Sequence, residues 1–199
     1  NYCEFSTGSS SVFGGGNGWG RRIAETIAGA GGRVLIIEKD DGSDAALAAI
    51  NESDVVFIAI PDAGIDALLT QFHEPLKSKF LLDCATNKRG FGDSLKRLAD
   101  DGAGVCSTHP MAASGSELLG QNALIMPIGS NAEPAEQIAI QLYRRLGMHC
   151  ETFDFNKHTE LMVIVQMLPH VMQRLTIDVR AQGLLQQDVE IDALANLTS

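Results

Sequence analysis

The chain's 199 residues are 45% hydrophobic and 20% charged, which is the composition of a folded globular protein and excludes a mainly disordered one. Its 25 acidic and 15 basic side chains give a formal net charge of −10, which argues against DNA, RNA and anionic membrane surfaces as partners. Four cysteines without a CxxC pair, and no apolar stretch long enough to span a membrane, predict a reduced cytoplasmic protein.

Short apolar runs alternate with amphipathic stretches over about the first 155 residues. Residues 6–11 are expected to form a flexible lead-in to a weak strand that ends at Val12 and Phe13. Further strands are predicted at residues 33–38, 54–60, 80–83, 104–107, 122–126 and 148–153, and helices at residues 19–30, 44–51, 62–72, 92–100 and 133–146. Because these strands are continuous apolar runs, helices are expected on both faces of the sheet. The pattern predicts an α/β fold with a Rossmann-type, doubly wound, mostly parallel sheet.

The pattern changes after about residue 155. Apolar side chains recur at three- and four-residue spacing over residues 158–185, which predicts one long helix with a kink at Pro169. A single helix cannot bury its own apolar stripe, so we expect it to pair with a second copy of the chain. The sequence therefore predicts a dinucleotide-binding domain at residues 1–155 and a helical segment at residues 156–199 that begins a dimerisation domain and forms a homodimer.

A run of glycines at residues 14–20 follows a predicted strand and opens a predicted helix. Glycines at such a place allow a tight turn and let backbone N–H groups approach a pyrophosphate at the helix N-terminus. Asn17 stands at the middle glycine of this fingerprint, where its tolerance of left-handed backbone angles would preserve the turn and its side chain would crowd the pyrophosphate. Glu38 lies 18 residues after Gly20, where a carboxylate accepts hydrogen bonds from an adenosine ribose and favours NAD over NADP, a preference that Lys39 weakens. A glycine turn with only a structural role is the alternative.

Three of the predicted strands end at the carboxyl edge of the sheet, where ligands bind in open α/β folds. Ile60 and Pro61 end one strand, Thr86 follows the next, and His109 follows the fifth. An unperturbed histidine pKa of about 6.5 suits His109 to accept a proton, and a histidine that is merely hydrogen-bonded at a strand end is the alternative. The residues expected to contact the cofactor, NAD with NADP as the alternative, are Gly15, Gly16, Asn17, Gly18, Trp19, Gly20, Glu38, Ile60, Pro61 and Ala85.

The predicted C-terminal helix carries polar side chains opposite its apolar stripe. His170 and Arg174 lie one turn apart and could bind an anion together, although a solvated polar face is the usual explanation of such a pair. With Ser114, they are the candidates for binding a small carboxylate substrate. No group of histidine, cysteine and acidic residues has the spacing of metal ligands, so no metal is expected.

Four blocks of sequence, in this order, resemble the prephenate dehydrogenases and their arogenate-using relatives, which are oxidoreductases of tyrosine biosynthesis. The resemblance runs from about Val12 to Ser199. Its blocks are residues 14–21, residues 83–88 (Asp-Cys-Ala-Thr-Asn-Lys), His109-Pro110-Met111 with Gly120-Gln121, and Leu168-Pro169-His170.

The resemblance implies a reaction in which NAD(P)⁺ takes a hydride from C4 of a cyclohexadienol and CO₂ is lost as the ring becomes aromatic. It implies that His109 removes the proton of the C4 hydroxyl and that Thr86 stands for a family serine and keeps its hydroxyl. It also implies that His170 lies near the bound substrate. The family has an arginine that holds a substrate carboxylate, which no position here matches, and Arg174 is the candidate substitute.

The sequence departs from the family pattern at Asn17 and Trp19 in the glycine turn, at Ala113, and at Thr159. Two other functions therefore stay open. Another Rossmann dehydrogenase, acting on a β-hydroxy acid or an imine, would use a lysine in its helical domain, and no lysine follows Lys157. A non-catalytic or truncated nucleotide-binding module is the second alternative.

Overall fold

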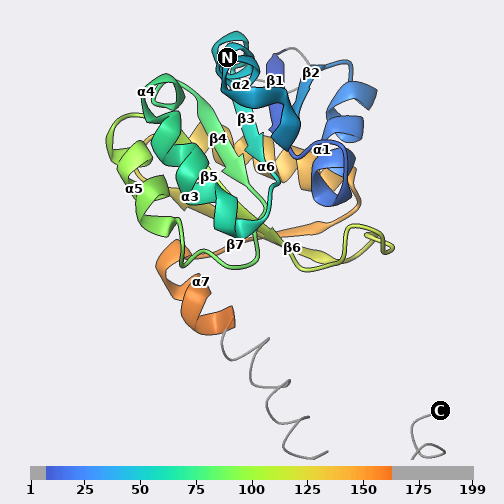
Figure 1. Ribbon diagram of the computed structural model, residues 1–199. Coiled ribbons are helices and arrows are strands. Elements are labelled where there is room, and N and C mark those ends of the chain that lie inside the picture. The colour runs from blue at the N-terminus through green and yellow to red at the C-terminus, as the bar shows by residue number, and fades with distance from the viewer. Residues whose placement is uncertain (1–7, 163–199) are drawn as a thin grey trace, which may run out of the picture. The chain divides into compact units, whose positions relative to one another are not determined.

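The computed structural model describes residues 8–162, and its centre is a seven-stranded sheet in the order β2-β1-β3-β4-β5-β6-β7 (Figure 1). All neighbouring strands are parallel except β5 and β6. The strands are β1 (Ser9–Phe13), β2 (Arg33–Ile37), β3 (Val55–Ile58), β4 (Phe80–Asp83), β5 (Gly104–Pro110), β6 (Asn122–Ile128) and β7 (His149–Thr152). The predicted mostly parallel, doubly wound sheet is confirmed.

Helices cover both faces of this sheet. They are α1 (Gly18–Gly29), α2 (Gly42–Glu52), α3 (Asp62–Gln71), α4 (His73–Leu76), α5 (Gly92–Asp100), α6 (Glu133–Arg145) and α7 (Phe155–Met162), with a 3-10 turn η1 (Lys39–Asp41) before α2. One apolar core lies between the sheet and α2, α3, α4 and α5, and the other between the sheet and α1 and α6. In Figure 1, α3 and α5 lie in front of the sheet and α6 lies behind it.

Strand β3 shows how the sequence builds both cores at once. Its side chains alternate between the two faces, so Val56 and Ile58 enter the core of α2–α5 while Val55 and Phe57 enter the core of α1 and α6. All four side chains are at most 2% exposed. A continuous apolar run is therefore what a central strand of this sheet requires.

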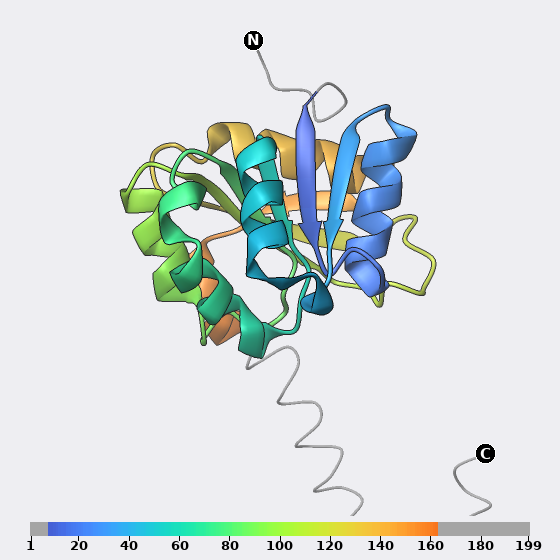
Figure 2. The same cartoon turned by 45° about the horizontal axis from the view of Figure 1, so that its top comes forward.

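The flexible lead-in expected at residues 6–11 is wrong where the structure describes it. Ser9, Ser10 and Ser11 form the first three residues of β1, in register with β2 on one side. Ser10 and Ser11 also pair with β3 on the other side, and both are fully buried. Serine has little preference for strands, so pairing with two neighbours determines the conformation here. Figure 2 shows the blue arrows of β1 and β2 pointing the same way.

Strand β5 is longer than the sequence predicts. It pairs with β4 only as far as Ser107, and it continues to Pro110 because antiparallel β6 pairs with residues 105–110. His109 was expected after the strand, but it lies inside it, opposite Leu124 of β6. The strand keeps the side-chain alternation over this extension, so Thr108 and His109 point to opposite faces of the sheet.

The chain divides into two compact units, residues 1–158 and residues 159–199. Helix α7 begins at Phe155 and is described as far as Met162, so the rest of the long helix expected at residues 158–185, with its kink at Pro169, lies outside the described residues. The predicted boundary after residue 155 and the predicted homodimer both stay predictions. Among the helices in residues 8–162, none has the length and apolar character to cross a membrane.

Candidate functional site

The glycine turn between β1 and α1 depends on two residues that cannot carry a side chain. Gly14 has a φ of +79°, and a Cβ there would lie 2.7 Å from the carbonyl oxygen of Ala59. A Cβ on Gly20 would overlap the carbonyl of Gly14. The backbone N–H of Gly14 donates to the carbonyl of Ile37 at 2.8 Å, which ties the turn to the end of β2. These contacts hold the start of α1 close against the carboxyl end of β1.

Replacing Gly20 by alanine is expected to lower the free energy of unfolding by about 1–3 kcal/mol, because the added methyl group meets backbone that cannot move aside. Gly29→Ala is the matched control in the same helix, where an added Cβ has no atom within 4 Å. It is expected to change the stability by at most about 1 kcal/mol, in the stabilising direction. Urea unfolding of both variants measures this, and equal losses would contradict the packing described here.

Asn17 does not use the left-handed backbone that the sequence suggested. Its φ and ψ are −139° and 164°, an extended conformation, and it is the N-cap of α1. The positive φ values fall instead on Gly14 and on Gly18, at +79° and +51°. Asparagine is therefore compatible with this turn, because the positive φ angles that the turn requires fall on glycines.

The surface of the glycine turn faces solvent at the start of α1. Gly16, Asn17 and Gly18 are exposed, and the first turn of α1 contains no acidic side chain. The first N–H groups of a helix lack intrahelical partners and favour an anion. A Cβ on Gly16 would lie 2.8 Å from the carboxylate of Glu38, so glycine at this position permits their close contact. This arrangement fits a pyrophosphate.

Glu38 lies beside the glycine turn, as its place after β2 predicted. Its Oε1 accepts a hydrogen bond from the backbone N–H of Gly16 at 2.5 Å. Its own backbone N–H donates to the carboxylate of Asp41 at 2.7 Å, which orients the residue at the start of η1. The exposed carboxylate of Glu38 is thus in position to accept hydrogen bonds from a ribose bound next to the turn.

The other residues expected at the cofactor occupy three further positions. Trp19 is half-buried against Tyr143 of α6, with ring centroids 6.2 Å apart and planes at 69°.

The side chain of Ile60 packs under the turn, 3.2 Å from where a Cβ on Gly14 would stand, and Pro61 is the exposed N-cap of α3. Ala85 is buried after β4, where its N–H donates to the carboxylate of Asp83 at 3.1 Å.

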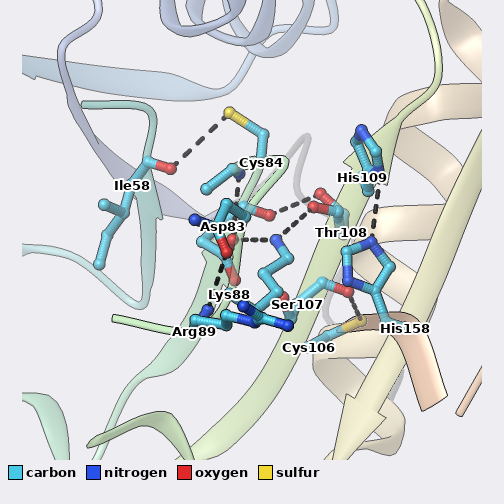
Figure 3. Close-up of polar contacts among 12 residues, drawn as sticks. Ile58, Asp83, Cys84, Lys88, Arg89, Cys106, Ser107, Thr108, His109 and His158 are labelled. Atoms are coloured by element: carbon cyan, nitrogen blue, oxygen red, sulfur yellow. Dashed lines mark hydrogen bonds and ion pairs between the residues drawn. The ribbon is translucent and has the colours of Figure 1, made fainter. Parts of the chain in front are cut away.

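A buried ion pair joins the ends of β4 and β5 (Figure 3). Lys88 and Asp83 form this pair with side chains that are 1% and 0% exposed. The ammonium of Lys88 also donates to the carbonyl of Thr108 at 2.8 Å. The hydroxyl of Thr108 lies 2.6 Å from the carbonyl of Asp83, to which it donates, and 2.7 Å from the hydroxyl of Tyr143. The sequence analysis did not predict that both of these charges are buried.

Burial favours the neutral forms of the thiol and the phenol beside this network. Burial, with the negative charge of Asp83 adding to it, raises the pKa of the Cys84 thiol to about 12. Burial also raises the pKa of Tyr143 well above its ordinary value. Thr86 is exposed at the same edge of the sheet.

His109 is paired with a second histidine, His158 of α7 (Figure 3). The Nδ1 atom of His109 and the Nε2 atom of His158 are 3.1 Å apart, and the two rings meet edge to face at 81°. The side chains are 3% and 0% exposed. Sequence analysis assigned no role to His158. The signal that could have found it is its spacing, because Phe155, His158 and Met162 form the buried face of α7.

Burial favours the neutral form of both imidazoles. Burial lowers the pKa of His109 to about 4, and the positive charge of Lys88 and the neighbouring His158 lower it further. Burial and then Lys88 lower the pKa of His158 to about 4 as well, against the opposing effect of Asp83. A neutral imidazole is the form that can accept a proton, and the lowered pKa of His109 favours that form.

The loop that follows His109 reaches back to the glycine turn. The guanidinium of Arg22 in α1 donates to the carbonyl of Ser116 at 3.0 Å. The hydroxyl oxygen of Ser114 lies 3.5 Å from the position of a Cβ on Gly18. Ser114 was expected at the substrate, and the structure places it beside the turn. The two other expected substrate contacts, His170 and Arg174, lie outside the described residues.

Several predicted site residues therefore share one edge of the sheet. The glycine turn with Glu38, the end of β3 at Ile60, and β5 with His109 all present groups at the carboxyl ends of parallel strands. Within residues 8–162, no group of three or more histidine, cysteine or acidic side chains is arranged to hold a metal ion.

No model of a protein family matches the chain, and no curated protein sequence matches it. Solved structures do. An arogenate dehydrogenase from Synechocystis has a TM-score of 0.71 and 17% identity, over 96% of this chain and 75% of the other. A prephenate dehydrogenase from A. aeolicus, in complex with hydroxyphenyl propionate and NAD⁺, has a TM-score of 0.63 and 16% identity, over 87% and 69%. A 3-hydroxyisobutyrate dehydrogenase from Mycobacterium tuberculosis has a TM-score of 0.65 and 14% identity, over 96% of this chain and 69% of the other.

The fold is that of the prephenate and arogenate dehydrogenases. The resemblance expected from the four sequence blocks is confirmed at this level. Identities of 14–17% establish the fold and leave the reaction open. These neighbours are dehydrogenases, one of them in complex with NAD⁺, and the same fold serves several reactions.

Proposed function

We propose that this chain is an NAD(P)-dependent dehydrogenase that oxidises and decarboxylates prephenate or arogenate. The observation that carries the proposal is His109, a buried neutral imidazole on β5 at the sheet edge that also holds the glycine turn. The structural likeness to prephenate and arogenate dehydrogenases supports the same assignment. Because the chain as a whole is strongly acidic, any carboxylate substrate would have to bind at local positive charge.

The residues of the glycine turn fit a dinucleotide. The exposed backbone N–H groups of Asn17 and Gly18 at the start of α1 would hold the pyrophosphate, and the carboxylate of Glu38, which the Gly16 N–H already contacts, would hold the adenosine ribose. Ser114 would add a hydroxyl on the other side of Gly18. Bound NAD supplies an acceptor for the hydride that leaves the substrate.

His109 handles the proton in the proposed reaction. Its Nδ1 faces His158, which leaves Nε2 for the substrate. Nε2 takes the proton of the ring hydroxyl as the hydride leaves the same carbon, and a carbonyl forms there. Breaking of the bond to the carboxylate then releases CO₂ and turns that carbonyl into an aromatic phenolate, to which the proton returns. Thr86 would place a hydroxyl near the reacting ring.

The proposal is tested by following NADH or NADPH formation with prephenate and arogenate as separate substrates, beside calorimetric titration with each nucleotide. We expect turnover with at least one of the two substrates. Nucleotide binding without turnover of either would favour a non-catalytic binding module, which the Asn17 side chain at the middle glycine position also favours. Absence of nucleotide binding would contradict every dehydrogenase assignment.

A second candidate is a dehydrogenase of β-hydroxy acids, which the likeness to 3-hydroxyisobutyrate dehydrogenase favours. Such sites usually centre on a lysine in the helical domain, and no lysine follows Lys157 in this chain. Turnover of 3-hydroxyisobutyrate in the same assay, with none of prephenate or arogenate, would establish this candidate.

Replacing Glu38 by glutamine is expected to weaken NAD binding about tenfold, because hydrogen bonds to a charged group contribute about 1.5–3 kcal/mol and a neutral amide recovers part of this. NADP binding is expected to weaken less or to improve, because a 2′-phosphate no longer meets a carboxylate. Asp40→Asn is the control, since it removes a charge from the neighbouring turn without touching the Gly16 contact. Calorimetric titration with both nucleotides measures the change, and an unaltered NAD/NADP ratio would contradict the placement of the ribose at Glu38.

A further inference from the structure

We infer that His158 is a positioning residue that fixes the tautomer of His109 by accepting a hydrogen bond from its Nδ1–H. The pairing of the two rings is observed in the structure and does not depend on the proposed function. Its catalytic consequence, a lone pair on Nε2 that faces the substrate, rests on the function proposed above.

The two rings are held by elements that are far apart in the chain. His109 lies within β5, between its partners in the sheet, and His158 projects from the first turns of α7. Their nitrogens are 3.1 Å apart, a hydrogen-bond distance, and both side chains are shielded from solvent. Water therefore cannot take over the contact, and each imidazole depends on the other at this nitrogen.

A hydrogen bond between two neutral imidazoles requires one donor and one acceptor. If His158 donates from Nε2, then Nδ1 of His109 accepts, and the proton of His109 sits on Nε2, where it blocks the base. If His109 donates from Nδ1, its Nε2 carries the lone pair and can take the substrate proton. The second arrangement also persists through the reaction. Once Nε2 has gained a proton, Nδ1 of His109 can only donate, so His158 must accept.

His158 differs from the carboxylate that orients the base in a Ser-His-Asp triad. A carboxylate would stabilise the imidazolium and raise the pKa of His109, whereas a neutral ring orients the base without that charge. The charged groups that act on the pair are Lys88, which lowers the pKa of both rings, and Asp83, which raises the pKa of His158. The pair therefore supplies an oriented base that stays unprotonated down to acidic pH.

The tautomer is measured in the full chain without nucleotide or substrate, by long-range ¹H–¹⁵N spectra of ¹⁵N-histidine-labelled protein. His109 is expected to carry its proton on Nδ1. The same form is expected in His158→Gln, whose side-chain oxygen can accept the bond. In His158→Leu, which has no acceptor, we expect the proton to move to Nε2. His149→Leu, at an exposed position on β7, is the control and should leave the His109 signals unchanged.

Activity provides the second readout. We expect kcat to fall about 10- to 100-fold in His158→Leu with KM retained, and to recover to within a few-fold of wild type in His158→Gln. In His158→Glu the acid limb of kcat/KM, expected near pH 4 in the wild type from the low pKa of His109, should move to higher pH by at least one unit. A fold check by circular dichroism accompanies each variant.

The outcomes separate this inference from the function proposed above. An Nε2–H tautomer of His109 in the wild type, or an unchanged Nδ1–H tautomer in His158→Leu, overturns the positioning role whatever reaction the chain catalyses. An Nδ1–H tautomer that depends on position 158, in a chain that turns over neither prephenate nor arogenate, supports the pair and contradicts the proposed reaction. If His158→Leu does not fold, the tautomer of His109 in the wild type and the pH dependence of kcat/KM in His158→Glu still test the positioning role.

Discussion

Replacing His109 by asparagine is expected to lower kcat for the proposed oxidation by about 100-fold or more while leaving the affinity for NAD unchanged. General base catalysis by a positioned side chain contributes roughly 10²- to 10⁴-fold, and an amide cannot accept the hydroxyl proton at neutral pH. Nucleotide affinity should persist, because the residues expected to hold the pyrophosphate and ribose lie on the glycine turn and at Glu38. Initial rates of NADH formation and calorimetric titration with NAD measure the two effects separately.

The control for this variant is His149→Asn, which changes an exposed histidine on β7 and should leave kcat unaltered. Asparagine at position 109 retains polar character, so the fold is expected to survive. A His109→Asn protein with wild-type turnover would remove this imidazole from the chemistry. A loss of NAD binding equal to the loss of turnover would mean that His109 supports the nucleotide rather than the proton transfer.

Replacing Lys88 by methionine is expected to lower the free energy of unfolding by about 3–5 kcal/mol, because it leaves the Asp83 carboxylate buried without its counter-charge. For a chain of this length, that corresponds to a fall in Tm of about 6–20 °C. The substitution also removes the donor to the carbonyl of Thr108. Thermal unfolding followed by circular dichroism measures the loss. The pKa of His109 should rise in the same variant, since the charge of Lys88 helps to keep it low.

The matched control is Arg33→Met, which breaks an ion pair with Glu52 whose side chains are 60% and 53% exposed. Exposed pairs contribute about 0–1 kcal/mol, so Tm should change little. Adding Asp83→Leu to the Lys88 variant should restore part of the stability, because no unpaired charge then remains buried. Similar losses for Lys88→Met and Arg33→Met would contradict the description of the Lys88–Asp83 pair as a buried one.

Local sequence predicts the elements of this fold well where their apolar pattern is continuous. The strand at residues 80–83 and the helix at residues 92–100 match the structure at both ends. The errors arise where pairing between distant segments decides the outcome. The serines of β1 become strand because β2 and β3 flank them, and β5 extends to Pro110 because antiparallel β6 continues beside it. Neither partner is visible from the local composition.

The site shows the same division. The glycine turn and its companion Glu38 follow from local motif and spacing, and the structure brings them into contact. Asn17 is accommodated for a different reason than the sequence suggested, because its backbone is extended. The partner of His109 lies 49 residues away on another element, so nothing near position 109 predicts His158. The burial of Lys88 likewise depends on β5, which supplies the carbonyl of Thr108.

The central claim is that a pyridine nucleotide binds at the glycine turn with its nicotinamide beside His109. A crystal structure of the chain with NAD tests this most directly. We predict the pyrophosphate on the backbone N–H groups of Asn17 and Gly18, the ribose on Glu38, and the nicotinamide ring in contact with the imidazole of His109. Nucleotide bound elsewhere on the chain, or a nicotinamide ring that does not approach His109, would contradict the account.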